Sequence, residues 1–168
     1  MKNKFSTRLG FTTIELLLYM GILTILISVL ASIFGAIIDS KLESEATSSV
    51  DQDGRYILAR LSRDMQSATS IASPAAGLQG SALQISVNSI AQTYAVNISN
   101  DLQITKSGQS DNLNSVDTSV SNLTFKRIGN GDVDDTIQMQ FTLTSKIQRR
   151  AGTSEVKSFK TTFGRHTL

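Results

Sequence analysis

The chain has 168 residues, of which 40% are hydrophobic and 18% charged, with a formal net charge of +2 at pH 7. This length allows one domain of about a hundred residues beside a long apolar run near the N-terminus. The chain contains no cysteine, which excludes disulfide frameworks, thiolate metal sites and cysteine nucleophiles. Sparse charges and abundant Ser, Thr, Asn and Gln outside the apolar run predict a polar, β-rich domain rather than a charged helical bundle.

The basic excess belongs to the first ten residues, which we predict to be a leader peptide (residues 1–10). Three of the 16 basic residues, Lys2, Lys4 and Arg8, lie there, and without them 13 basic residues face 14 acidic ones. The rest of the chain then carries a formal charge of −1. The overall basic balance is therefore no evidence for nucleic-acid binding.

An uncharged apolar segment follows the leader. Leu16 to Ile38 comprise 23 residues without a charge. As a helix with a rise of ~1.5 Å per residue they would measure about 35 Å, enough to cross a ~30 Å hydrocarbon layer. The run exceeds the apolar part of a secretory signal, which reaches about 15 residues. Basic residues precede the segment and mixed charges from Asp39 to Glu45 follow it, which predicts a single span with its N-terminus in the cytoplasm.

The start of this segment carries a specific motif, Gly10-Phe11-Thr12-Thr13-Ile14-Glu15, followed by three leucines. A glycine at a polar–apolar junction leaves the backbone open to a protease. A carboxylate in lipid costs several kcal/mol unless it is paired, so Glu15 needs a partner. One alternative is a capping box, because Thr12-x-x-Glu15 fits the S/T-x-x-E pattern and the helix dipole favours a carboxylate in the first turn.

The motif resembles the class III signal of type IV pilins and pseudopilins over about 30 residues. In that family a membrane prepilin peptidase cleaves after the glycine and methylates the new first residue. The resemblance implies cleavage between Gly10 and Phe11, N-methylation of Phe11, and pairing of Glu15 with the N-terminal amine of a neighbouring subunit. It also implies, as partners, other pilin-like subunits, the peptidase, a polytopic platform protein and a cytoplasmic assembly ATPase.

Two departures from the family pattern favour its minor pilin or pseudopilin branch over a main shaft subunit. Many shaft subunits carry a proline within the apolar helix, whereas the single proline here is Pro74. The chain also lacks the C-terminal cysteine pair of many shaft subunits. The segment Arg60-Leu61-Ser62-Arg63-Asp64-Met65-Gln66-Ser67-Ala68 resembles the equivalent helix end in the same branch.

Beyond the apolar helix, for which we expect residues 11–38, an amphipathic pattern predicts that the helix continues over residues 39–73. Apolar residues spaced by three and four mark one face: Leu42, Ala46, Val50, Ile57, Leu61, Met65 and Ala68. Oppositely charged residues four apart are expected to form ion pairs on an exposed face and to stabilise the helix slightly: Lys41–Glu45, Asp51–Arg55 and Arg60–Asp64. Pro74 ends the helix. Gly54 interrupts the apolar face, so a kink, or a break into two helices, is the alternative.

Residues 74–168 have the alternating pattern of an antiparallel β-domain. Apolar side chains recur every second residue in six runs: 83–87, 94–98, 102–104, 123–125, 137–143 and 159–163. Turn-type residues separate these runs, and residues 106–118 predict a longer surface loop. The expected fold class is α+β, with the long N-terminal helix packed against an antiparallel β-meander and covering its apolar face.

Three polar features of this half suggest sites but have simpler interpretations. Asn130, Asp132 and Asp134 alternate as calcium ligands do, but the loop lacks a bidentate glutamate and occupies a turn, so we favour a solvated turn over a metal site. The basic run 146–150 favours a solvated hairpin over nucleic-acid contact. His166, three residues from the C-terminal end of the sequence, is not expected to serve as a ligand or general base.

The sequence contains no G-x-S-x-G, Walker, H-E-x-x-H or C-x-x-C motif. We therefore expect a structural protein without a cofactor rather than an enzyme. The first hypothesis is a pilin-like subunit that starts in the cytoplasmic membrane and ends in a surface fibre for adhesion, motility, DNA uptake or secretion. The second is a permanently anchored single-span protein with an external β-rich binding domain, which needs neither Gly10 nor Glu15.

Overall fold

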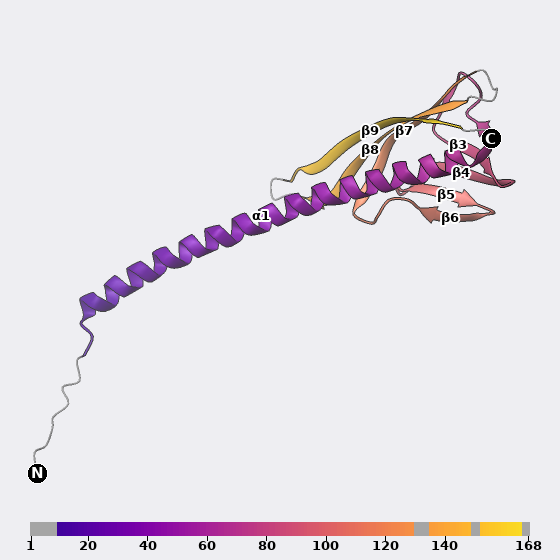
Figure 1. Ribbon diagram of the computed structural model, residues 1–168. Helices are drawn as coiled ribbons and strands as arrows, with labels where there is room; N and C mark the ends of the chain where they lie inside the picture. The colour runs from indigo at the N-terminus through magenta and orange to yellow at the C-terminus, as the bar shows by residue number, and fades with distance from the viewer. Residues whose placement is uncertain (1–9, 130–134, 149–151, 166–168) are drawn as a thin grey trace, which may run out of the picture. The chain divides into compact units, whose positions relative to one another are not determined.

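The computed structural model describes residues 10–129, 135–148 and 152–165. Within them, the helix α1 (Thr13–Gln66) is followed by strands only (Figure 1). These are β1 (Ala68–Ser73), β2 (Gln79–Gly80), β3 (Leu83–Val87), β4 (Ile90–Val96), β5 (Leu102–Lys106), β6 (Gln109–Asn112), β7 (Thr118–Ile128), β8 (Thr136–Gln148) and β9 (Ser154–Gly164). The chain divides into two compact units, residues 1–40 and 41–168, and α1 belongs to both.

The strands of the second unit form two antiparallel sheets rather than one meander. Sheet A has the order β1-β3-β4-β5-β6, and sheet B has the order β2-β7-β8-β9. The α+β class with a helix on antiparallel sheets is confirmed, whereas the expectation of a single continuous meander is wrong. The chain leaves sheet A after β6 because the buried Asn114 accepts a hydrogen bond from the Leu102 amide at 2.8 Å and donates one to the Thr118 carbonyl at 3.0 Å.

The alternating pattern located most strands but not all their ends. The two-residue turn Asn88-Ser89 joins β3 to β4 with φ angles of 50° and 63°, as a tight hairpin with the twist of its strands requires. Strand β4 stops at Val96, and Ile98 is fully exposed, so the predicted run was too long. Within the loop expected over residues 106–118, residues 109–112 pair with β5 as strand β6.

Helix α1 ends at Gln66, seven residues before the predicted end. Residues 68–73 form strand β1 instead and pair with β3. The helical pattern predicted that Ala68 is buried. It is buried, but as the first residue of a strand. The β-branched residues Thr69 and Ile71 favour the extended backbone, and the Thr69 hydroxyl donates to the Ser86 carbonyl at 3.0 Å. Pro74 therefore follows a strand rather than a helix.

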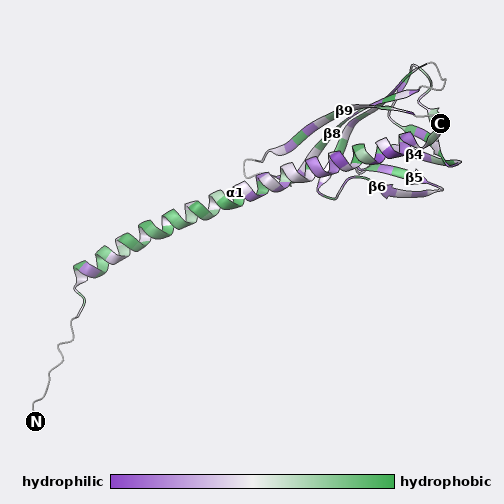
Figure 2. Cartoon of the chain, viewed as in Figure 1, coloured by the Kyte–Doolittle hydropathy of each residue, from purple (hydrophilic) through white to green (hydrophobic). Residues whose placement is uncertain are grey.

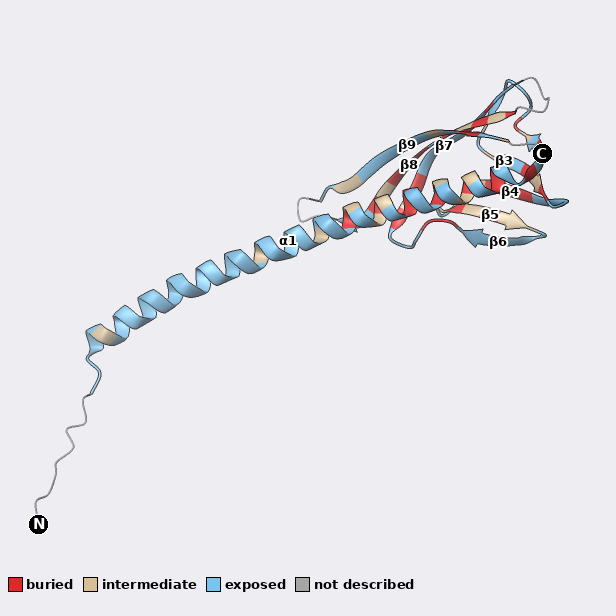
Figure 3. Cartoon of the chain, viewed as in Figure 1, coloured by how far each residue is buried: buried red, intermediate tan, exposed pale blue. Residues whose placement is uncertain are grey.

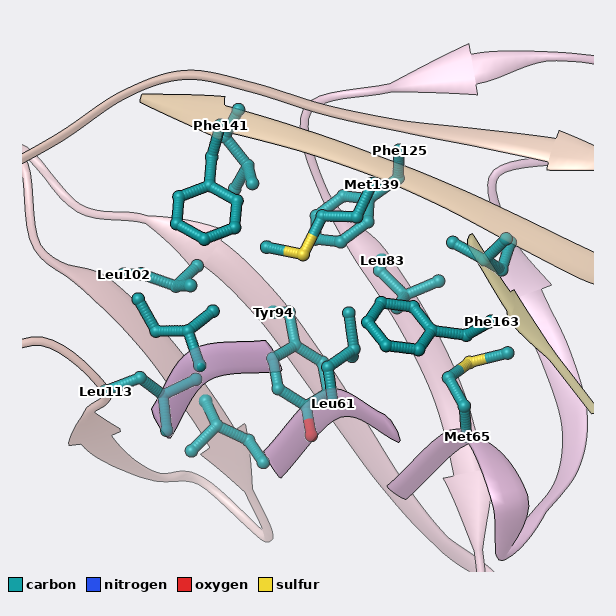
Figure 4. Packing of buried hydrophobic residues seen from close by; sticks show 14 of the residues in the cluster. Leu61, Met65, Leu83, Tyr94, Leu102, Leu113, Phe125, Met139, Phe141 and Phe163 are labelled. Carbon is teal, nitrogen blue, oxygen red and sulfur yellow. The ribbon is translucent and has the colours of Figure 1, made fainter. Parts of the chain in front are cut away.

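One face of α1 and the inner faces of both sheets enclose the core (Figures 3 and 4). The predicted apolar face of the helix is confirmed except at Leu42, which is half-buried, and at Ala68, which is buried but lies in strand β1. The largest fully buried side chains come from all three layers: Tyr94, Phe125, Phe141, Ile57, Leu61, Met65, Leu83, Ile85, Leu102, Ile137, Met139 and Leu143. Burial of each such side chain stabilises the fold by about 1.5–3 kcal/mol, so the packing of α1 against the two sheets holds the second unit together.

Helix α1 runs through Gly54 without the break that its sequence position suggested. The ring of Phe159 on β9 lies directly against Gly54, where an added Cβ would stand 2.2 Å from the ring Cζ. Phe159 also stacks on Phe141, with ring centroids 5.1 Å apart. The glycine is needed for this close approach between helix and strand, and the alternative of two separate helices is wrong.

Substitution of Gly54 by alanine is expected to destabilise the second unit. The methyl group must displace the Phe159 ring, and such overpacking costs about 1–3 kcal/mol, more than the ~1 kcal/mol that alanine gains in a helix. Denaturant unfolding of the full chain in detergent measures the change. Gly21→Ala is the matched control, because nothing lies within 4 Å of the added Cβ. A Gly54→Ala variant as stable as the parent would contradict this packing.

Two carboxylates of α1, Asp53 and Asp64, are buried and bind residues beyond the helix, which the sequence did not reveal; the predicted Arg60–Asp64 pair is present, but Asp64 is buried rather than exposed. Asp53 accepts hydrogen bonds from the Ser115 amide and hydroxyl, both at 2.8 Å, and from the Thr118 hydroxyl at 2.5 Å. Asp64 accepts one from Arg60 Nε at 2.9 Å and one from the Tyr94 hydroxyl. Burial and the bond to Asp64 raise the pKa of Tyr94 far above its usual value, so its hydroxyl remains a donor.

The i,i+4 spacing predicted that Asp51 pairs with Arg55. In the structure Asp51 pairs instead with Lys157 on β9. The Lys157 ammonium donates to the Asp51 carboxylate at 2.6 Å, with both side chains partly exposed. This hydrogen bond is the main cause that lowers the pKa of Asp51 below its usual value of 3.8, and Arg55 adds a smaller electrostatic contribution.

The lowered pKa gives the Asp51–Lys157 pair a defined pH dependence. Folding stabilises the ionised form of Asp51, so its contribution is present above pH 3.8 and is lost as the pH falls through the folded-state pKa. Asp51→Asn is expected to lower the free energy of unfolding modestly at pH 7 and not at all well below pH 3.8. Denaturant unfolding of both proteins across this range measures the difference, and a difference that does not change with pH would contradict the pairing.

Candidate functional site

The first unit presents an apolar helical surface with no cover from its own residues. Every large hydrophobic side chain from Ile14 to Ile38 is exposed, and the segment is mostly hydrophobic in Figure 2. Among the described residues, α1 is the one helix long and apolar enough to cross a membrane. An exposed apolar surface of this extent requires lipid or protein around it, and the segment is compatible with a single-pass membrane anchor.

The hydroxyl groups of this segment are satisfied within the helix. Thr24 donates to the Met20 carbonyl at 2.8 Å, Ser28 to the Thr24 carbonyl at 2.9 Å, and Ser32 to the Ser28 carbonyl at 3.0 Å. A polar group with a partner costs far less in an apolar surrounding than one without. These three residues therefore do not prevent the segment from lying in lipid or against other apolar helices.

The helix begins directly after the predicted cleavage point. Thr12 is the N-cap of α1, and its hydroxyl accepts a hydrogen bond from the Glu15 amide at 3.4 Å. This contact is the threonine half of the capping box. The Glu15 carboxylate accepts a hydrogen bond from the Tyr19 hydroxyl at 3.1 Å, one turn further along the helix.

Gly10 and Phe11 lie outside the helix and are exposed. No atom of the described chain would lie within 4 Å of a Cβ at Gly10, and Phe11 is 74% exposed. The Phe11 ring contacts the Tyr19 ring edge-on, with centroids 6.0 Å apart. The structure thus brings Phe11 and Glu15 to the same residue, Tyr19. Sequence reasoning missed Tyr19, although its i,i+4 spacing from Glu15 was a usable signal.

The other predicted sites gain no further support. Asn130, Asp132 and Asp134 lie outside the described residues, as do Arg149, Arg150 and His166. In the described part of the chain no three His, Cys, Asp or Glu side chains gather as metal ligands. The neighbouring Asp135 is buried and binds Arg127, which also donates to the Ile71 carbonyl at 3.0 Å. A shallow hollow of about 400 Å³ is lined by neutral residues such as Asn100 and Asn122.

Comparisons with protein-family models, curated proteins and solved structures find no match. The candidate site is therefore defined by the chain's own residues. It consists of the exposed Gly10–Phe11 bond, the Glu15 carboxylate held by Tyr19, and the uncovered apolar helix that follows.

Proposed function

We propose that this chain is a structural subunit of a type IV pilus-like surface or secretion fibre, in the manner of a minor pilin or pseudopilin. It is processed between Gly10 and Phe11 and assembled through the apolar part of α1. The observation that carries the proposal is the coincidence of the Gly10–Glu15 motif with an exposed cleavage point and an uncovered apolar helix.

The assembly step follows from the electrostatics of the helix start. Cleavage after Gly10 frees the amine of Phe11, which carries a positive charge. Between apolar helices the effective dielectric constant is low, so this amine and the Glu15 carboxylate of a neighbouring subunit attract each other more strongly than in water. The pair neutralises both charges only when the two helices adopt one register. The apolar segments then exchange lipid for one another while the β-domain faces outward.

The proposed partners follow from the same step. Other pilin-like subunits supply the helices against which α1 packs, and a prepilin peptidase supplies the cleavage and the methyl group. A platform protein and an assembly ATPase act indirectly. The subunit begins as a single-pass protein of the cytoplasmic membrane, with its N-terminus in the cytoplasm, and becomes part of an extracellular fibre. This function requires no cofactor and no catalytic residue.

One observation favours a second candidate, a permanently anchored protein with an external β-rich binding domain. The Tyr19 hydroxyl donates to the Glu15 carboxylate and the Thr12 hydroxyl accepts from the Glu15 amide, so the carboxylate has one partner, Tyr19, without a second subunit. In this case the motif is only a helix start, and the chain keeps its leader. The two candidates therefore differ in processing and in the consequence of removing Glu15.

The mass of the mature chain tests the processing step. We expect protein from native membranes or from sheared surface fibres to begin at Phe11 and to carry one added methyl group on its α-amine. Intact-mass measurement with N-terminal peptide mapping detects both changes. Gly10→Val, which places a branched side chain at the cleavage point, is expected to leave the leader attached. A chain that starts at Met1 in cells with an active prepilin peptidase contradicts the proposal.

Removal of the carboxylate tests the assembly step. Glu15→Ala is expected to be cleaved normally but to lose at least about tenfold in the amount of subunit recovered in sheared fibres, because a charge-assisted pair contributes 1.5 kcal/mol or more. Immunoblots of sheared and membrane fractions measure the ratio. Glu45→Ala is the matched control on the same helix. If the permanent anchor is correct, Glu15→Ala removes a charge penalty and leaves the protein's location unchanged.

A further inference from the structure

Glu15 is less accessible than its neighbours in the first six turns of α1. From Gly10 to Phe34 it is the one residue that is half-buried, while all the others are exposed. The cover comes from Tyr19, whose hydroxyl bonds the carboxylate at 3.1 Å and whose ring contacts Phe11. One side chain therefore contacts both residues that the proposed function uses, the future N-terminal residue and the carboxylate.

The direction of helical side chains explains this contact. Each Cα–Cβ bond tilts toward the N-terminus of the helix, so a residue at i+4 leans back over residue i. Tyr19 thus reaches Glu15 from one turn below, with its hydroxyl directed toward the polar end of the helix. Tyrosine suits this place because its ring is compatible with apolar surroundings and its hydroxyl supplies a hydrogen bond.

We propose that Tyr19 is a positioning residue of the assembly site, which holds the Glu15 carboxylate toward the N-terminal end of the helix until the amine of a second subunit binds it. This inference rests on the proposed function and adds a residue that the Gly10–Glu15 motif does not contain. A carboxylate has two oxygens and several acceptor positions. The bond from Tyr19 occupies part of this capacity and leaves the rest for the incoming ammonium group.

The hydrogen bond from Tyr19 also lowers the free-energy cost of keeping the Glu15 carboxylate in apolar surroundings before assembly. A carboxylate in apolar surroundings is costly unless it accepts hydrogen bonds, and Tyr19 supplies one within the same chain. In the fibre the same bond restricts the carboxylate to fewer orientations, so less freedom is lost when the amine arrives. Tyr19 therefore acts on the precursor and on the assembled subunit through one hydroxyl group.

Two variants of Tyr19 separate the hydroxyl from the ring. Tyr19→Phe removes the hydrogen bond and keeps the ring against Phe11, whereas Tyr19→Leu removes both. Tyr56→Phe is the matched control, since Tyr56 is an exposed tyrosine further along α1. We expect normal cleavage for all three full-length proteins. We expect about a tenfold loss of Tyr19→Phe from sheared fibres, the factor of one hydrogen bond to a charged group, and no loss of Tyr56→Phe.

A spectroscopic measurement reports the contact itself. The chain has four glutamates, Glu15, Glu43, Glu45 and Glu155, so 13C-carboxyl-labelled glutamate gives four signals, and Glu15→Gln assigns one of them. In vesicles of phosphatidylethanolamine and phosphatidylglycerol, the Glu15 signal is expected to shift in Tyr19→Phe and to stay in place in Tyr56→Phe. Solid-state NMR on the full chain measures this shift.

The outcomes decide between a positioning role and a packing role. A shifted signal together with a loss of fibre incorporation in Tyr19→Phe supports the inference. Normal incorporation of Tyr19→Phe overturns it, and a defect confined to Tyr19→Leu assigns the residue to ring packing alone. An unshifted signal also overturns it. If the parent chain itself is absent from fibres, the proposed function fails, and the NMR shift still shows whether the hydroxyl binds Glu15.

Discussion

A helix that is apolar on all sides must be surrounded by something other than water, and this requirement governs α1 from Ile14 to Ile38. Within the described residues, the large side chains of this segment have no cover of their own. The hydroxyl groups of Thr24, Ser28 and Ser32 are bound to the helix backbone, so these bonds lower the cost of placing this segment in apolar surroundings. Lipid and a bundle of similar helices both meet the requirement. Between Phe11 and Ile38 the one charged side chain is Glu15. Lipid offers its carboxylate no partner, whereas a neighbouring protein chain could offer one.

The general fold could be predicted because hydrophobic periodicity is a local property of the sequence. The change from spacings of three and four to a spacing of two separated the helix from the sheets and located most strands. The division into two sheets could not be predicted, because it depends on where the chain leaves sheet A, and the hydrogen bonds of the buried Asn114 to Leu102 and Thr118 at that point are not visible in a hydrophobic pattern. The end of α1 was misplaced because Ala68 continues the spacing of the helix face and is equally well buried in a strand.

The candidate site shows the same division between local and distant information. Gly10, Phe11 and Glu15 could be identified from a short motif, because that motif is read directly from neighbouring residues. Tyr19 lies one turn away, and although its i,i+4 spacing hinted at a contact with Glu15, the hydrogen bond is established only by the direction of the side chain. Gly54 is a similar case, since a glycine in a helical pattern signals a break until the ring of Phe159 is seen against it.

The two buried carboxylates of α1 have a mechanical consequence. Asp53 binds Thr118, the first residue of β7 in sheet B, and Ser115 in the loop before it. Asp64 binds Tyr94 in sheet A. They lie about 16 Å apart along the helix axis at ~1.5 Å per residue. A tensile load along the helix would therefore shear two separated sets of hydrogen bonds at once. The helix is thus attached to both sheets at two points along its length.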